Sequence, residues 1–123
     1  MVKISTKQKG DEAETKACEF LIQQKFILLA KNYRCHFGEI DLIMQDKEDI
    51  VFVEVRSRQR TDYGNAIESV DYYKREKLIK TATHFLQSKR WLYQFNSRFD
   101  IIAFHPVLGK MQLEWIKNAF PRY

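Results

Sequence analysis

The chain has 123 residues, 45% of them hydrophobic, and its 21 Lys and Arg residues outnumber 16 Asp and Glu residues to give a formal net charge of +5. This length and composition predict a single domain over residues 1–123 with its own core, and the basic charge favours a polyanionic partner. No apolar run is as long as a membrane span, and the first nine residues lack the apolar segment of a signal peptide, so we expect a cytoplasmic protein with no membrane partner. The four glycines form neither a Walker A loop nor a dinucleotide fingerprint, and Cys18 and Cys35 lack the paired spacing of a zinc site.

An amphipathic helix is predicted from about Asp11 to Gln24. Its apolar positions at helical spacing are Ala13, Ala17, Phe20 and Leu21. Glu14 lies within or beside this stripe, and two interpretations stay open. Either its methylene groups pack while its carboxylate reaches water, or the carboxylate serves a site. The apolar run from Phe26 to Ala30 then predicts the first strand, and residues 34–38 a turn.

The stretch from Gly38 to Arg58 predicts a hairpin that carries acidic side chains in the middle of its strands. Residues 39–44 and 50–56 have strand character, and the polar residues 45–49 connect them. Because side chains alternate between faces, Glu39 and Asp41 share one side of the first strand, while Glu54 and Arg56 share one side of the second. If the register brings these sides together, three carboxylates and a guanidinium group converge.

Carboxylates crowded on a partly buried face are unfavourable unless a cation or a proton offsets their charge. Mg²⁺ is a hard ion that uses one or two carboxylates together with substrate phosphate oxygens, so Asp41 and Glu54 are candidate ligands for Mg²⁺ or Mn²⁺. The alternative is a surface strand whose acids pair with Arg56 and Arg58, an arrangement that is common and weak.

A row of basic side chains follows the second acidic strand. Arg56, Arg58 and Arg60 point the same way while the chain stays extended, and guanidinium groups suit bidentate contacts to a phosphate backbone. A solvated basic loop is the equally weighted alternative.

The longest helical pattern runs from Ile67 to Lys89, and Lys74 interrupts its apolar face. We expect Lys74 to point toward the sheet as a phosphate contact, whereas Lys77 has a solvent-facing position; the alternative is that Lys74 snorkels to water. The aromatic connector of residues 90–96 favours closure of the core over base stacking. Strands are predicted at 98–104 and 110–116, with mobile ends at 1–8 and 117–123.

These residues carry a family resemblance. Asp41 followed after a short hairpin by Glu54-Val55-Arg56 resembles the Asp, then Glu-x-Lys signature of the restriction-endonuclease-like nuclease superfamily. Over nearly the whole chain, from about Lys9 to Ile116, the pattern resembles the YraN family of small bacterial proteins, which is similar to archaeal Holliday-junction resolvases. The segments that carry it are Gly10, Ala13-Glu14, Ala17, Phe20-Leu21, Asn32-Tyr33-Arg34, the FGEIDLI run from Phe37 to Ile43, the VFVEV run from Val51 to Val55, Tyr63-Gly64, Lys74 and Arg98-Phe99-Asp100.

The resemblance implies an α/β fold with a restriction-endonuclease-like core, in which a mixed central β-sheet is flanked by helices in the order α-β-β-β-α-β-β. It also implies a nucleic-acid substrate. Glu14 becomes a candidate third acid of the metal site, the backbone carbonyl of Val55 a further ligand, and Arg98 and Asp100 a structural pair.

The leading hypothesis is a metal-dependent phosphodiesterase acting on DNA, with branched DNA as a candidate substrate and a homodimer suited to two cuts across a junction. Asp41 and Glu54 would hold the metal, and Arg56, Arg58 and Lys74 would clamp phosphate. Arg56 stands where the signature has lysine, and arginine is a poor proton acceptor. The alternatives are a nucleic-acid-binding module that kept the fold without turnover, and a protein-interaction module whose acids pair internally.

Overall fold

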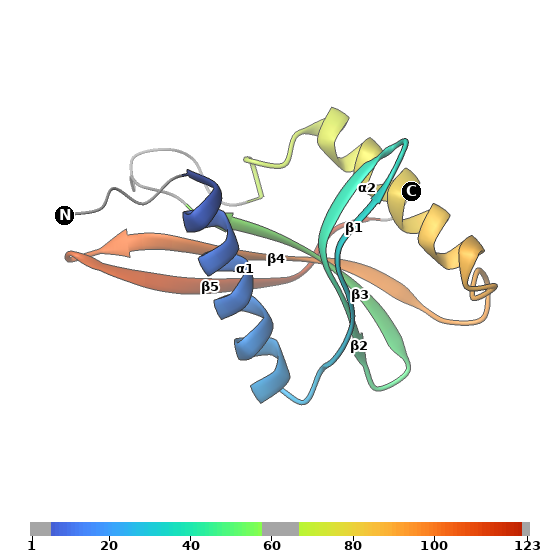
Figure 1. Cartoon of the computed structure of the whole chain (residues 1–123), viewed down its shortest axis with the longest axis horizontal. Helices are drawn as coiled ribbons and strands as arrows, with labels where there is room; N and C mark the ends of the chain where they lie inside the picture. The colour runs from blue at the N-terminus through green and yellow to red at the C-terminus, as the bar shows by residue number, and fades with distance from the viewer. Residues whose placement is uncertain (1–5, 58–66, 122–123) are drawn as a thin grey trace.

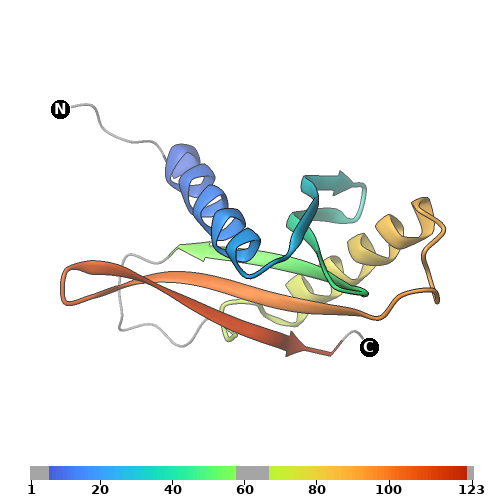
Figure 2. The ribbon, with the colours of Figure 1, turned by 90° about the horizontal axis from the view of Figure 1, so that it is seen from below.

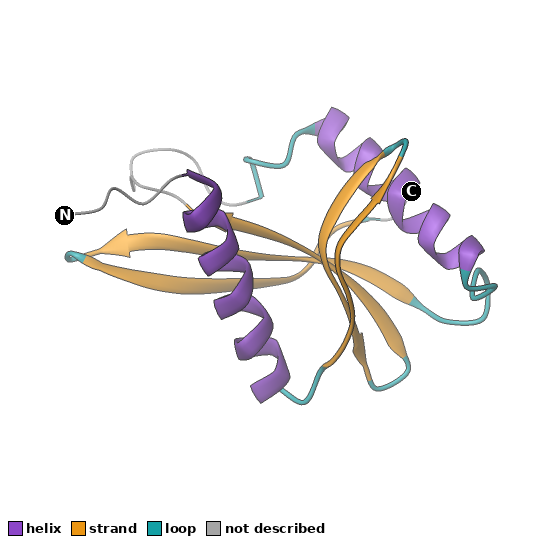
Figure 3. Ribbon diagram, in the orientation of Figure 1, coloured by secondary structure: helices purple, strands orange, loops and turns teal. Residues whose placement is uncertain are grey.

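The computed structural model describes residues 6–57 and 67–121, with side chains from Gly10 onward. The predicted order of elements is confirmed (Figures 1 and 3). The elements are α1 (Thr6–Gln23), β1 (Ile27–Cys35), β2 (Gly38–Asp46), β3 (Asp49–Ser57), α2 (Tyr72–Ser88), β4 (Ser97–Val107) and β5 (Lys110–Phe120). The fold class is therefore α/β, as predicted.

The five strands form one mixed sheet in the order β1-β2-β3-β4-β5. β3 and β4 are parallel, whereas the other three neighbouring pairs are antiparallel. Parallel neighbours need a crossover connection, and α2 lies in the segment that joins β3 to β4. The mixed sheet with helical cover agrees with the prediction.

The alternation of side chains along β3 divides the core into two layers. Val51 and Val53 belong to a cluster with α1 residues such as Leu21, whereas Ile50 and Phe52 belong to a cluster with α2 residues such as Phe85. Successive strand residues point to opposite faces, so α1 and α2 cover opposite faces of the sheet. Figure 2 shows α1 lying across one of them.

The alternation in β2 breaks at Asp41. Ile40 and Leu42 are two residues apart and should share a face, yet Ile40 packs in the α2 cluster and Leu42 in the α1 cluster. The backbone pairing of β2 with β3 also ends here, because Leu42–Val53 is its last pair toward Gly38. Beyond this point the β1–β2 hairpin diverges from β3 (Figure 1).

The diverging end of the hairpin packs against α2. The Tyr33 hydroxyl is 2.5 Å from His84 Nδ1. A Cβ at Gly38, where φ is +154°, would lie 3.3 Å from Thr81 Oγ1 and 3.7 Å from Lys77 Cβ. Glycine at this position therefore permits both the backbone conformation and the close approach to the helix.

Several predicted boundaries were wrong. The first strand extends to Cys35, and the last strand continues through Phe120, whose ring stacks on Phe99 with centroids 4.7 Å apart, so residues 117–120 are part of the sheet and not a mobile end. Residues 6–8 belong to α1 and were likewise misassigned to a mobile end. α2 begins at Tyr72 and not at 67 because Asp71 is its N-cap and accepts the Lys74 N–H at 2.9 Å.

The predicted pair of Arg98 and Asp100 is confirmed. Asp100 is 1% exposed and accepts a hydrogen bond from Arg98 Nε at 3.0 Å. It also accepts from Trp115 Nε1 at 3.0 Å and from the Asn118 N–H at 2.9 Å. Both of these donors belong to β5, so a buried carboxylate attaches the terminal strand to β4.

The aromatic connector closes one end of the core, as predicted. Trp91 and Phe95 pack against the α2 cluster, whereas Tyr93 is 94% exposed. Neither of the two helices that the structure describes is long and apolar enough to cross a membrane.

Candidate functional site

Asp41 occupies the point where β2 and β3 separate. Its Oδ2 atom accepts the Val55 N–H at 2.8 Å. Because the backbone ladder has already ended at Leu42–Val53, the side chain takes over a donor that the ladder no longer satisfies. The divergence of the two strands therefore fixes the position of the carboxylate.

Glu54 lies beside Asp41 on the face that α2 covers. Burial raises the pKa of Glu54 to about 8, and the charge of Asp41 and a hydrogen bond with it act in the same direction. Arg56 and Lys74 lower this pKa, but they do not offset the other effects. A carboxyl group in this setting retains a proton at neutral pH unless a cation compensates its charge.

Glu14 reaches Asp41 from α1, on the opposite face of the sheet. Partial burial raises the pKa of Glu14 to about 7, and the charge of Asp41 and a hydrogen bond with it contribute. Asp41 thus lies between two acids with raised pKa values. Sequence reasoning placed Glu14 beside the apolar stripe, and the structure puts its carboxylate next to Asp41.

Asn32 links Glu14 to Glu39, a role that sequence reasoning did not predict. With its amide nitrogen facing the acids, Asn32 donates to Glu14 Oε2 and to Glu39 Oε1, both at 3.1 Å. It falls opposite Asp41, between the backbone pairs Lys31–Leu42 and Tyr33–Ile40, and its φ of 51° is one that asparagine tolerates. Glu39 also pairs with Arg34 at 3.1 Å.

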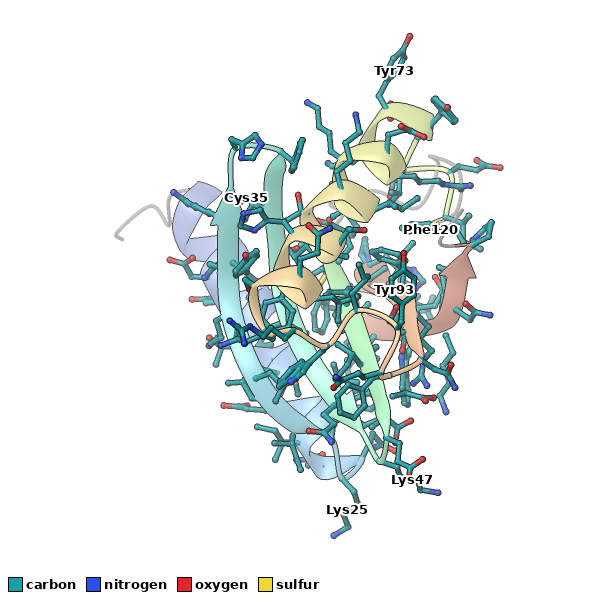
Figure 4. All side chains as sticks on the ribbon, turned by 90° about the vertical axis from the view of Figure 1, so that its right-hand side faces the viewer. Lys25, Cys35, Lys47, Tyr73, Tyr93 and Phe120 are labelled. Atoms are coloured by element: carbon teal, nitrogen blue, oxygen red, sulfur yellow. The ribbon has the colours of Figure 1, made fainter. Side chains whose placement is uncertain are left out.

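A cavity of about 260 Å³ opens between the diverging hairpin and α2. Its lining residues are Gly38, Glu39, Asp41, Glu54, Lys74, Lys77 and Leu78. Figure 4 shows α2 running beside the hairpin, with Cys35 near the end of β1 and Tyr73 at the start of the helix. Lys74 points to the sheet side as predicted. Lys77 is exposed, as its predicted solvent-facing position requires, and it also lines the cavity.

Arg56 lies close enough to Glu54 to lower its pKa. Its Nε and Nη2 atoms are buried and have no hydrogen-bond partner among residues 6–57 and 67–121. An unpaired buried guanidinium nitrogen is unfavourable, because the group has lost water without gaining an acceptor. Arg58 and Arg60, the rest of the predicted arginine row, lie outside the described residues.

The ligand atoms that the site offers are carboxylate oxygens, which are of the type that a hard cation binds. Asp41 and Glu54 line one cavity, and the charges of Arg56 and Lys74 only partly offset the raised pKa of Glu54. Carboxylate oxygens are the ligands that Mg²⁺ prefers. Within the described part of the chain, however, no group of three or more His, Cys, Asp or Glu residues has a spacing that could hold a metal ion. Glu14 contacts Asp41 from the opposite side of the sheet, which keeps it apart from Glu54.

Comparisons with known proteins place the chain in a family. The model of the uncharacterised protein family UPF0102 matches residues 13–104. A UPF0102 protein of Nitrosomonas eutropha is 50% identical over 116 residues, which cover 94% of this chain and 96% of the relative. A UPF0102 protein of Pseudomonas paraeruginosa is 43% identical over 119 residues, covering 94% of each chain.

One solved structure, that of Pyrococcus furiosus SfsA in complex with Ca²⁺, is distantly similar, with a TM-score of 0.40 and 11% sequence identity. The match covers 87% of this chain and 63% of the SfsA chain. The resemblance noted from the GEIDLI and FVEV segments is confirmed at the level of the family: the chain belongs to the UPF0102 family, also called YraN.

Proposed function

We propose that this chain is a metal-dependent nuclease that acts on DNA, with branched or junction DNA as its candidate substrate. The observation that carries the proposal is the position of Asp41 between Glu14 and Glu54. Both neighbours have raised pKa values, and Asp41 and Glu54 line a cavity that Lys74 and Lys77 also line. Acids with raised pKa values in a cavity that also contains lysines are typical of sites that bind a cation together with an anionic substrate.

Asp41 and Glu54 would hold Mg²⁺ or Mn²⁺. Glu14, which meets Asp41 from the α1 side, would act on the ion through that carboxylate. The bound ion would polarise the scissile phosphate and supply a hydroxide near neutral pH. Glu54 must release its proton to become a ligand, so its pKa of about 8 makes ion binding stronger as the pH rises toward that value. The Asp41 carboxylate is held by the Val55 N–H, which leaves its orientation defined before the ion arrives.

The basic residues would bind and orient the phosphate groups. The buried Nε and Nη2 atoms of Arg56 lack acceptors among the described residues, and a phosphate oxygen would supply one. Lys74, on the cavity wall, would provide the amine that the signature places at the position of Arg56. Positioning of the water by Lys74 and clamping of phosphate by Arg56 would then be separate tasks.

A second candidate function is a nucleic-acid-binding module without turnover. The observation that favours it is Arg56 itself, because arginine at the lysine position stays charged and cannot accept a proton from water. The same cavity would then bind phosphate and an ion without cleaving the chain.

Cleavage of labelled single-stranded, duplex and four-way-junction DNA in Mg²⁺ or Mn²⁺ distinguishes these two functions. Asp41→Asn and Glu54→Gln keep the size of each side chain while removing its charge. Glu48→Gln, at the exposed turn between β2 and β3, is a matched control. We expect cleavage by the unchanged protein and the control, and loss of cleavage in both site variants. DNA binding without cleavage in all four proteins would reject the nuclease and support the binding module.

A further inference from the structure

Two exposed aromatic residues directly precede residues that line the cavity. On α2, Tyr73 is 78% exposed and directly precedes Lys74, while on the hairpin Phe37 is 38% exposed and directly precedes Gly38. Lys74 and Gly38 both line the cavity. Figure 4 shows the Tyr73 ring projecting away from the body of the protein. Exposed aromatic rings next to charged cavity residues mark a candidate binding surface.

The rings are arranged as pairs before any ligand binds. The His36 and Phe37 rings have centroids 4.0 Å apart at an interplanar angle of 39°, and the Tyr72 and Tyr73 rings meet edge to face at 6.0 Å. The close approach of Gly38 to Lys77 and Thr81 holds the hairpin end against the helix. The two ring pairs therefore belong to segments, the β1–β2 turn and α2, that pack against each other.

Basic groups accompany the rings. Lys77 lies one helical turn after Tyr73 on the same side of α2, and Lys74 follows Tyr73 directly, so two cations lie within a turn of the exposed ring. Aromatic faces alternating with cations form the surface that binds single-stranded nucleic acid, in which the bases stack and the phosphates pair with lysine or arginine. Bases inside a duplex already stack on one another and do not offer their faces.

We propose that Tyr73 and Phe37 stack on unpaired nucleobases, so that the cavity prefers single-stranded or splayed nucleic acid to continuous duplex. This inference rests on the proposed nucleic-acid function of the same cavity and names its substrate class. Tyr73 and Phe37 select the unpaired strand, while Lys74, Lys77 and Arg56 contact its phosphates.

Binding measured in EDTA tests the inference separately from cleavage. Fluorescence anisotropy compares a labelled single strand with the matching duplex for the unchanged protein, Tyr73→Ala and Phe37→Ala. We expect each variant to bind the single strand about tenfold more weakly, as is usual for the loss of one stacking ring, and to keep its duplex affinity. Tyr73→Trp should retain the preference, because tryptophan also presents a ring.

The matched control is Tyr93→Ala, which removes a ring that is 94% exposed on the connector after α2, remote in sequence from the lysines of the cavity. It should bind both DNAs as the unchanged protein does. A strand containing 2-aminopurine adds a direct signal, because stacking on Tyr73 or Phe37 quenches its fluorescence.

Equal losses for single strand and duplex, no loss at all, or failure of the unchanged protein to prefer the single strand would overturn the inference. Preferential binding without cleavage in Mg²⁺ would reject the nuclease and leave the stacking surface standing. Cleavage without a preference for unpaired bases would reject the stacking surface alone. Thermal melting of each variant confirms that it is folded.

Discussion

Asp41 Oδ2 accepts the Val55 N–H at 2.8 Å, one residue beyond the last backbone pair of β2 and β3. The carboxylate therefore has a structural task as well as a chemical one. We predict that Asp41→Asn is more stable than Asp41→Ala by about 1–2 kcal/mol, because the amide oxygen can still accept this bond whereas alanine leaves the donor unsatisfied. Both variants remove the same negative charge, so the difference between their urea unfolding free energies isolates the hydrogen bond. Equal stabilities would contradict this.

Stability should fall as the pH rises from about 4.5 to about 8. The folded-state pKa values of Glu54 and Glu14 are raised to about 8 and about 7 from 4.5, so in this interval the folded protein binds more protons than the unfolded chain. The stabilisation is complete below the unfolded pKa and is lost as the pH passes through the folded values. For Glu54, we expect a loss of about 2 kcal/mol after allowing for its access to solvent.

Urea unfolding at about pH 5 and about pH 9 measures this effect. Glu54→Gln has no proton to lose, so its stability should change less between the two conditions and should exceed that of the unchanged protein at the higher pH. Titrating groups away from Asp41 and Glu14 contribute equally to both proteins and cancel in the comparison. A variant that follows the same pH profile as the unchanged protein would refute the raised pKa of Glu54.

Divalent ions should stabilise the protein through Asp41 and Glu54. At an ion concentration about ten times the Kd, binding to the folded state contributes about 1.4 kcal/mol, which raises the Tm of a chain of this size by roughly 5 °C. The shift should be larger at pH 8 than at pH 6 because Glu54 must lose its proton. Asp41→Asn and Glu54→Gln should lose the shift, and Glu48→Gln should keep it. An unchanged shift in the two site variants would place ion binding elsewhere.

The charge of Arg56 should be measurable in the titration of Glu54. Because Arg56 lowers the pKa of Glu54, Arg56→Ala should raise it above about 8, whereas Arg56→Lys should hold it near its present value. Carboxyl chemical shifts followed by NMR against pH give this pKa directly. We also expect Arg56→Ala to weaken DNA binding. Arg34→Ala removes an exposed arginine paired with Glu39 and serves as the control, with no expected effect on Glu54.

Asp100 should be among the residues that matter most for stability. Asp100→Ala would leave the Arg98 guanidinium, whose side chain is 18% exposed, without its buried partner and would free two donors of β5. We expect a loss of about 3–5 kcal/mol. Asp49→Ala is the matched control, because Asp49 meets the same arginine at 3.6 Å from a side chain that is 41% exposed, and it should cost less than about 1 kcal/mol. Urea unfolding of both variants decides the point.

The sequence predicted the element order, the acidic hairpin and the α/β class because these depend on local pattern. Alternation along β3 was sufficient to put Glu54 and Arg56 on one face with Phe52. Alternation along β2 was not sufficient, because the strand breaks its period at Asp41 as the hairpin separates from β3. The sequence pattern of residues 38–46 does not predict this loss of alternation, because it depends on how the hairpin packs on α2.

Long-range contacts account for the other differences. Asn32 was noted for its place in the family pattern, but its bridge between Glu14 and Glu39 needs α1, β1 and β2 together. Lys77 was expected to face solvent and is exposed, but its place in the cavity wall could not be predicted, because it depends on the approach of Gly38 to α2. Phe120 was assigned to a mobile tail, whereas its burial follows from contacts with Phe99 and Arg75.

The charge of Asp41 affects acids on both faces of the sheet. Glu14 meets it from the side of α1 and Glu54 from the side of α2, so the protonation of either acid changes the free energy of protonating the other through the shared carboxylate. A cation held by Asp41 in the cavity would offset the charge that raises the pKa of Glu14, so ion binding on the α2 face would shift the titration of an acid on the α1 face.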